Sequence, residues 1–155
     1  MKTRTIGLLL VAVLAAAFVS FAADDVELGT WKLNEAKSKL APGVGKNVTV
    51  TYEKAGDSIK ATIDGMDADG KATHSEWTGK FDGKDYPVSG DATSDMRSYK
   101  RVDAHTITVT AKKGDKVTLT ARIAVSADGK TRTVTATITN AKGEKVKSVG
   151  VYDKQ

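Results

Sequence analysis

Arg97, Tyr99 and Arg101 alternate along one predicted strand and form a set whose chemistry suggests ligand binding. Because successive side chains of a strand point to opposite faces, these three share one face. If that face points inward, two guanidinium groups near a phenol would suit an anionic head group. On an exposed strand, their stems would instead cover neighbouring apolar surface. The sequence leaves both interpretations open.

His74 and Glu76 also share a strand face, with Trp77 on the opposite one. A His beside a carboxylate could serve acid–base catalysis or bind a metal. The sequence has no Gly-x-Ser-x-Gly elbow, no second His at ligand spacing and no phosphate-binding loop; the other His, His105, begins a strand beyond a turn. We therefore expect two polar residues on a solvated face, and the sequence predicts a non-enzymatic protein without a cofactor.

Segment 65–70, followed by Glu76, matches part of an EF-hand calcium loop at Asp67, Asp69, Gly70 and Glu76. The first ligand position fails because Gly65 stands where a carboxylate belongs. Asp-Ala-Asp-Gly is also an ordinary hairpin turn. The sequence predicts no metal site, although calcium at Asp67, Asp69 and Glu76 stays open as an alternative.

Apolar and polar residues alternate from Val26 to Tyr152, which predicts an all-β fold. Gly and Asp recur between the alternating runs, as tight hairpins require, so consecutive strands should pair antiparallel. The predicted strands are 27–34, 47–54, 58–64, 71–81, 84–89, 96–102, 105–112, 116–126, 131–140 and 144–153.

An open meander of this length would leave two exposed edges that invite aggregation. We therefore predict an antiparallel up-and-down meander of about eight to ten strands closed into a barrel. A two-sheet sandwich is the alternative. One short helix should follow the first strand, where Asn34 can cap residues 35–40 before Pro42 and Gly43.

Residues 1–22 have the features of a signal peptide: basic residues, then an apolar stretch over 6–19, then small residues over 20–22. We expect cleavage after Ala22, a single β-barrel domain over 23–155 and a secreted or periplasmic location without a stable membrane anchor. An uncleaved anchor is the alternative, since 6–23 is nearly long enough to span a bilayer.

The sequence contains no Cys, which excludes disulfides, thiol catalysis and a lipid-modified Cys. Loss of Lys2 and Arg4 with the leader lowers the formal charge from +5 to +3. No Arg cluster with interleaved aromatic residues appears, so we expect no nucleic-acid partner. A protein partner stays unknown.

Gly29-Thr30-Trp31 on the first predicted strand resembles the Gly-x-Trp opening of the calycins, the group that contains lipocalins and fatty-acid-binding proteins. Val151-Tyr152 resembles the end of a fatty-acid-binding protein. Segments 31–34 and 36–39 are similar to those of uncharacterised secreted bacterial proteins. The calycin resemblance implies a barrel with Trp31 closing one end.

The sequence also departs from that pattern. Fatty-acid-binding proteins have an Arg where this chain has Gly150, and segment 35–46 is too short for their two lid helices. Lipocalins usually stack a late Arg on the Trp, whereas the last predicted strand offers only Lys145 and Lys147. We therefore do not carry over a bound fatty acid.

Side-chain volume favours a ligand inside the barrel. After the leader the chain has seven aromatic residues, and its apolar face is mostly Val, Ile and Ala, which do not easily fill a barrel of this size. We expect a small, mainly apolar ligand, and the candidate ligand-binding residues are Trp31, Arg97, Tyr99, Arg101 and Tyr152. The alternative is a surface-interaction or inhibitor module with a filled barrel or sandwich.

Overall fold

The computed structural model describes residues 25–155, and the predicted signal peptide, 1–22, lies outside this range. The described chain is all-β, as predicted, and each predicted strand overlaps an observed one. The elements are β1 Gly29–Leu33, η1 Glu35–Lys37, β2 Lys46–Ala55, β3 Ser58–Met66, β4 Ala72–Gly79, β5 Tyr86–Ser89, β6 Met96–Asp103, β7 Thr106–Lys113, β8 Lys116–Val125, β9 Thr131–Thr139 and β10 Lys145–Lys154.

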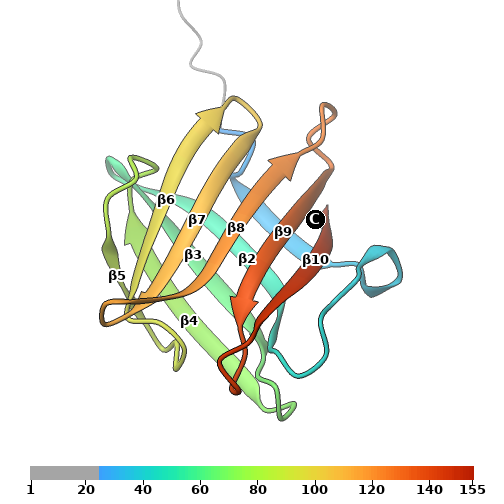
Figure 1. Cartoon of the computed structure of the whole chain (residues 1–155). Coiled ribbons are helices and arrows are strands. Elements are labelled where there is room, and N and C mark those ends of the chain that lie inside the picture. The colour runs from blue at the N-terminus through green and yellow to red at the C-terminus, as the bar shows by residue number, and fades with distance from the viewer. Residues whose placement is uncertain (1–24) are drawn as a thin grey trace, which may run out of the picture.

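Strand β1 closes the barrel because it pairs antiparallel with both β2 and β10. Trp31 stands opposite Val50 on β2 and Lys154 on β10. The other strands pair with their sequence neighbours, so the ten described strands form a closed up-and-down barrel (Figure 1). Closure is confirmed, and the two-sheet sandwich is wrong.

The barrel has two distinct ends, which we call the mouth and the base. Residues 25–28 and the β2–β3, β6–β7 and β8–β9 hairpins lie at the mouth. The β3–β4, β7–β8 and β9–β10 hairpins lie at the base, as the opposite directions of these turns in Figure 1 show. Gly56 in the β2–β3 hairpin and Gly129 in the β8–β9 hairpin have φ of +61° and +71°, a conformation that favours glycine.

The predicted short helix after the first strand is confirmed as a single turn, shorter than the segment 35–40. Only the 3₁₀ turn Glu35–Lys37 forms, and the Asn34 side chain caps it by accepting the Lys37 N–H at 3.2 Å. The helix stops because the following residues join the sheet: Lys39 forms a β-bridge with Val149, and the Ser38 hydroxyl accepts the Val151 N–H at 2.9 Å. Backbone pairing with β10 outweighs the local helix signal.

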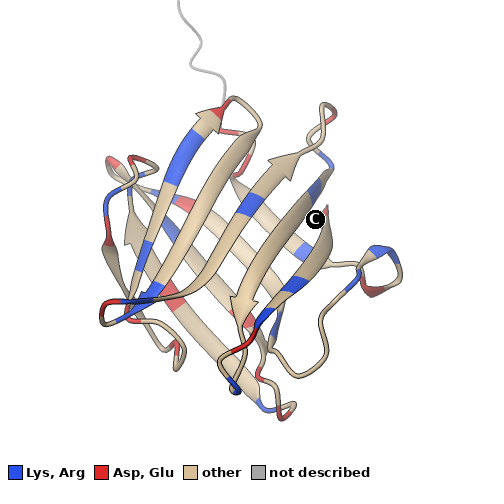
Figure 2. Ribbon diagram, viewed as in Figure 1, with Lys and Arg blue, Asp and Glu red and all other residues tan. Residues whose placement is uncertain are grey.

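An aromatic cluster packs part of the barrel interior. It consists of Tyr52, Trp77, Phe81, Tyr86 and Tyr99, with ring centroids 4.4 to 6.3 Å apart. The outer strand faces carry Thr and charged residues, and Figure 2 shows basic and acidic positions spread over strands and loops. In the described part of the chain, no helix is long and apolar enough to span a bilayer.

Candidate functional site

Arg97, Tyr99 and Arg101 lie on the inward face of β6. Tyr99 pairs with Val109 of β7 and is 3% exposed, while Arg97 and Arg101 pair with the buried Ala111 and Ile107. The side chains of both arginines are also largely covered. The exposed-strand interpretation is therefore wrong, and a role in ligand binding remains a prediction for these residues.

The guanidinium groups of Arg97 and Arg101 do not form one joint site, because they lie near opposite ends of the barrel. Four residues of strand place them roughly 13 Å apart along β6. Arg97 donates to Asp91 at 2.5 Å near the base. Arg101 donates to Asp25 at the mouth and lies 5.0 Å from the centroid of the Phe81 ring.

Trp31 and Tyr152 surround a third arginine that sequence reasoning missed. The Arg132 guanidinium carbon lies 5.3, 5.3 and 4.9 Å from the ring centroids of Trp31, Tyr52 and Tyr152. Arg132 is 2% exposed. Its inward position was visible in the sequence, because it continues the alternation of Val134, Ala136 and Ile138 on β9.

An Arg does stack on Trp31, although the last strand offers none. The stacking Arg comes from the start of β9 and not from the last strand. Strand β10 also extends one residue beyond its predicted end, and the Lys154 ammonium lies 5.0 Å from the Trp31 ring centroid. Trp31 is thus covered by two cations at the mouth.

Glu27 is the second residue that sequence reasoning missed. It is fully buried, and its Oε2 lies 3.9 Å from Nη1 of Arg132. Among residues 25–155, neither Glu27 carboxylate oxygen has a hydrogen-bond partner. Burial raises the pKa of Glu27 to about 7, although the positive charge of Arg132 opposes the rise.

Residues 25–28, which we call the strap, hold Glu27 in this position. A turn places the Leu28 N–H 2.9 Å from the Asp25 carbonyl, and the Glu27 N–H donates to the Asp25 carboxylate at 3.1 Å. The indole N–H of Trp31 donates to the Glu27 carbonyl at 2.8 Å. The strap therefore enters the barrel mouth just before β1 begins.

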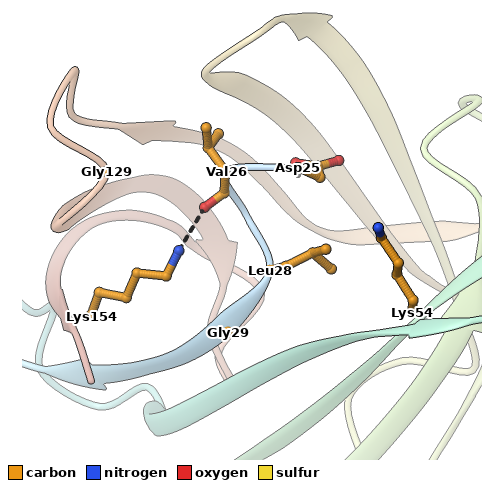
Figure 3. A pocket seen from close by; sticks show the side chains of 7 residues that line it. All are labelled: Asp25, Val26, Leu28, Gly29, Lys54, Gly129 and Lys154. Atoms are coloured by element: carbon orange, nitrogen blue, oxygen red, sulfur yellow. Dashed lines mark hydrogen bonds between the residues drawn. The ribbon is translucent and has the colours of Figure 1, made fainter. Parts of the chain in front are cut away.

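The strap borders an open pocket of about 620 Å³ at the mouth. Figure 3 shows Lys154 reaching the Val26 carbonyl, at 3.4 Å, with Leu28 between Lys154 and Lys54 in this view. Lys54 and Lys154 occupy the inward register of their strands, since Lys54 pairs with Ile59 and Lys154 with Trp31. The pocket is lined by Asp25, Val26, Leu28, Gly29, Lys54, Gly129 and Lys154.

His74 and Glu76 lie on the outer face of β4, away from this pocket. His74 is exposed and Glu76 is half-buried. His74 Nδ1 lies 2.7 Å from Asp64, and Glu76 accepts from Lys60 at 2.7 Å. The hydrogen bond from Lys60 lowers the pKa of Glu76. Trp77 faces inward, as predicted, so the structure places these two polar residues on a solvated face.

The calcium alternative at Asp67, Asp69 and Glu76 is not supported. One Asp67 carboxylate oxygen accepts the backbone N–H groups of Asp69 and Lys71, both at 2.9 Å, which is the ordinary turn geometry. Glu76 lies along β4, where it pairs with Lys60. Within the described residues, no group of three or more His, Asp or Glu side chains is placed to hold a metal.

Comparisons with known proteins yield likenesses to solved structures. No family model matches the chain, and no curated protein matches it. Among solved structures, the chain is similar to a redesigned β-barrel, mFAP1, bound to DFHBI. The TM-score is 0.47 and the sequence identity 12%, over 83% of this chain and 95% of that chain.

Proposed function

We propose that the protein is a secreted or periplasmic, non-enzymatic binding protein that holds a small, mainly apolar molecule in the mouth of its barrel. The observation that carries this proposal is the open pocket of about 620 Å³. Its volume lies in the range of roughly 300–1,000 Å³ that is typical of small-molecule sites, and barrel mouths are common places for them.

The pocket walls favour a ligand with an apolar body and a polar end. Val26 and Leu28 offer aliphatic surface and pack against the hydrophobic core. Lys54 and Lys154 supply positive charge at the sides. A few polar groups beside an apolar wall orient a ligand without contributing most of its affinity.

An uncharged hydrophobic fluorophore tests the proposal. We expect N-phenylnaphthylamine to give a saturable signal with the exported protein, and apolar competitors to displace it. Leu28→Glu should weaken binding at least about tenfold, because it places a charge in the apolar wall. Val102→Glu, at an exposed position of β6, is the matched control and should bind as the unchanged protein does.

Two results would overturn the proposal. One is the absence of a saturable, displaceable signal from a folded protein. The other is equal binding by Leu28→Glu and Val102→Glu, which would place the fluorophore elsewhere.

Export has a separate test, because it depends on residues 1–22 alone. Expression of the full chain in a bacterium, followed by fractionation and intact-mass measurement, should yield a periplasmic species that begins at Ala23. A species that retains residues 1–22 in the membrane fraction would instead support the uncleaved anchor.

A further inference from the structure

Polar contacts with arginine and lysine side chains attach the strap to the barrel. Asp25 pairs with Arg101 of β6, and Glu27 with Arg132 of β9. The Val26 carbonyl accepts from Lys154 of β10 at 3.4 Å. The strap thus occupies the positively charged wall of the mouth as a ligand would, with two carboxylates of its own.

The Glu27–Arg132 contact is poorly made for a buried ion pair. Its closest nitrogen and oxygen atoms are 3.9 Å apart, whereas a good arginine–carboxylate pair is bidentate at roughly 2.7–2.9 Å. Across the described residues, Nε and Nη1 of Arg132 and both Glu27 oxygens have no hydrogen-bond partner. Buried charged groups without hydrogen bonds are costly, so the Glu27–Arg132 pair holds the strap only weakly.

Displacement of the strap would change the charge of the mouth. The inward-facing cations there are Arg101, Arg132, Lys54 and Lys154, and the strap supplies the carboxylates of Asp25 and Glu27. With the strap displaced, these cations would face the pocket without the two carboxylates. The exposed site would then attract an acidic group.

We propose that the strap is an internal ligand, and that an acidic group on an incoming molecule competes with the Glu27 carboxylate for Arg132. The acidic group takes the unpartnered N–H donors of Arg132 in the frame of Trp31, Tyr52 and Tyr152. The apolar body of the same molecule lies in the mouth, in the space that Val26 and Leu28 of the displaced strap leave against the core. This inference rests on the proposed function and adds both a ligand class and a means of regulation.

Two fluorophores that differ in charge separate this inference from the proposed function. Anilinonaphthalene sulfonate carries an acidic group, and N-phenylnaphthylamine is its uncharged analogue. Glu27→Gln removes the competing charge and keeps the side-chain shape. We expect it to tighten sulfonate binding at least about tenfold, equivalent to about 1.4 kcal/mol, and to leave the uncharged probe unchanged.

A matched control and a second variant complete the design. Glu76→Gln removes one carboxylate from the outer face and alters the net charge equally, so both affinities should stay as they are. Arg132→Gln should abolish most sulfonate binding and retain the uncharged probe. Hydrogen exchange in residues 25–28 should become faster when the sulfonate binds, because the strap is released.

The outcomes are distinguishable. If the uncharged probe binds saturably and Glu27→Gln leaves sulfonate binding unchanged, the proposed function stands and the competition is overturned. Equal tightening of both probes by Glu27→Gln would also overturn competition, since it indicates steric release. If neither probe binds to any folded variant, both proposals fall.

Discussion

The barrel contains two arginine–carboxylate pairs of opposite quality, one at each end. At the base, Asp91 and Arg97 approach to 2.5 Å, and the Asp91 carboxylate also accepts from the Thr93 N–H at 2.8 Å, the Thr93 hydroxyl at 2.7 Å and the Ser94 hydroxyl. At the mouth, Glu27 and Arg132 are 3.9 Å apart, and neither Glu27 oxygen has a hydrogen bond within residues 25–155.

The difference lies in hydrogen bonding, because both carboxylates are desolvated. Burial raises the pKa of Asp91, but hydrogen bonds from Ser94 and Thr93 and the charge of Arg97 outweigh it and bring the pKa to about 2. Burial dominates at Glu27, whose pKa rises to about 7. The Asp91–Arg97 pair at the base of the barrel therefore holds the β5–β6 loop in place. The Glu27–Arg132 pair at the mouth is available for exchange with another acidic group.

The largest expected effect on stability follows the loss of the Asp91–Arg97 ion pair. Asp91→Ala should lower the free energy of unfolding by about 3–5 kcal/mol, because it leaves Arg97 without its carboxylate and removes the acceptor of Ser94 and Thr93. Glu27→Gln should not lower it and should raise it by up to about 3 kcal/mol, because a neutral side chain avoids the cost of ionising a buried carboxyl at neutral pH. Urea denaturation at neutral pH measures both, and the reverse order would break the comparison.

The pH dependence of stability should differ in sign between the two ends. Glu27 has a folded-state pKa above its unfolded value of 4.5. Its contribution to the free energy of unfolding is therefore full below pH 4.5 and is lost as pH rises toward 7. The loss is at most about 3 kcal/mol. The charged groups that act on Glu27 are Arg132, Arg101, Asp25 and Lys154.

Asp91 behaves in the opposite way. Its folded-state pKa lies below the unfolded value of 3.8, so its contribution to the free energy of unfolding is full above that pH and is lost as pH falls toward 2. Denaturation curves at several pH values should show that the free energy of unfolding falls between pH 4.5 and 7 in the unchanged protein but not in Glu27→Gln. An identical decline in that variant would assign it to other groups.

A smaller effect is expected for Trp31→Phe, which sharpens the role of the strap. The change removes the indole N–H that donates to the Glu27 carbonyl at 2.8 Å and keeps most of the aromatic contact with Arg132. We expect a loss of about 1 kcal/mol in unfolding free energy and tighter sulfonate binding than in the unchanged protein. Unaltered binding would show that this hydrogen bond does not restrain the strap.

The smallest effect should follow His74→Ala on the outer face of β4. Among residues 25–155, the ion pairs of His74 are with two solvent-accessible carboxylates, Asp64 at 2.7 Å and Glu76 at 3.9 Å. Exposed pairs of this kind contribute little, so the unfolding free energy should change by less than about 0.5 kcal/mol. Either fluorophore should bind as before, and a marked change in affinity would point to a second site on this face.

The strands could be predicted from the sequence because most of them carry a period of two and are followed by a turn that contains Gly or Asp. The face of Arg97 and Arg101 could not, since both faces of β6 mix polar and apolar residues and only the pairing with β7 decides between them. Arg132 could have been recognised from the inward alternation of β9. Glu27 could also have been noticed, since it precedes Gly29 and Trp31 at alternate positions.

The contact between Glu27 and Arg132 could not have been predicted from the sequence. It joins residues from the start of the described chain and the start of β9, and it exists only because β1 closes the barrel beside β10. No local pattern specifies such a contact, nor the number of hydrogen bonds that a buried carboxylate receives. The sequence could indicate that charged residues face inward, but not which of them would be left without partners.

Carbon-detected NMR of the Glu27 side-chain carboxyl, with and without anilinonaphthalene sulfonate, tests the central claim most directly. The account predicts a pKa near 7 in the free protein and a fall toward the usual range of a solvated Glu when the sulfonate displaces the strap. A Glu27 carboxyl that titrates normally in the free protein, or whose pKa is unaffected by the bound sulfonate, would contradict it.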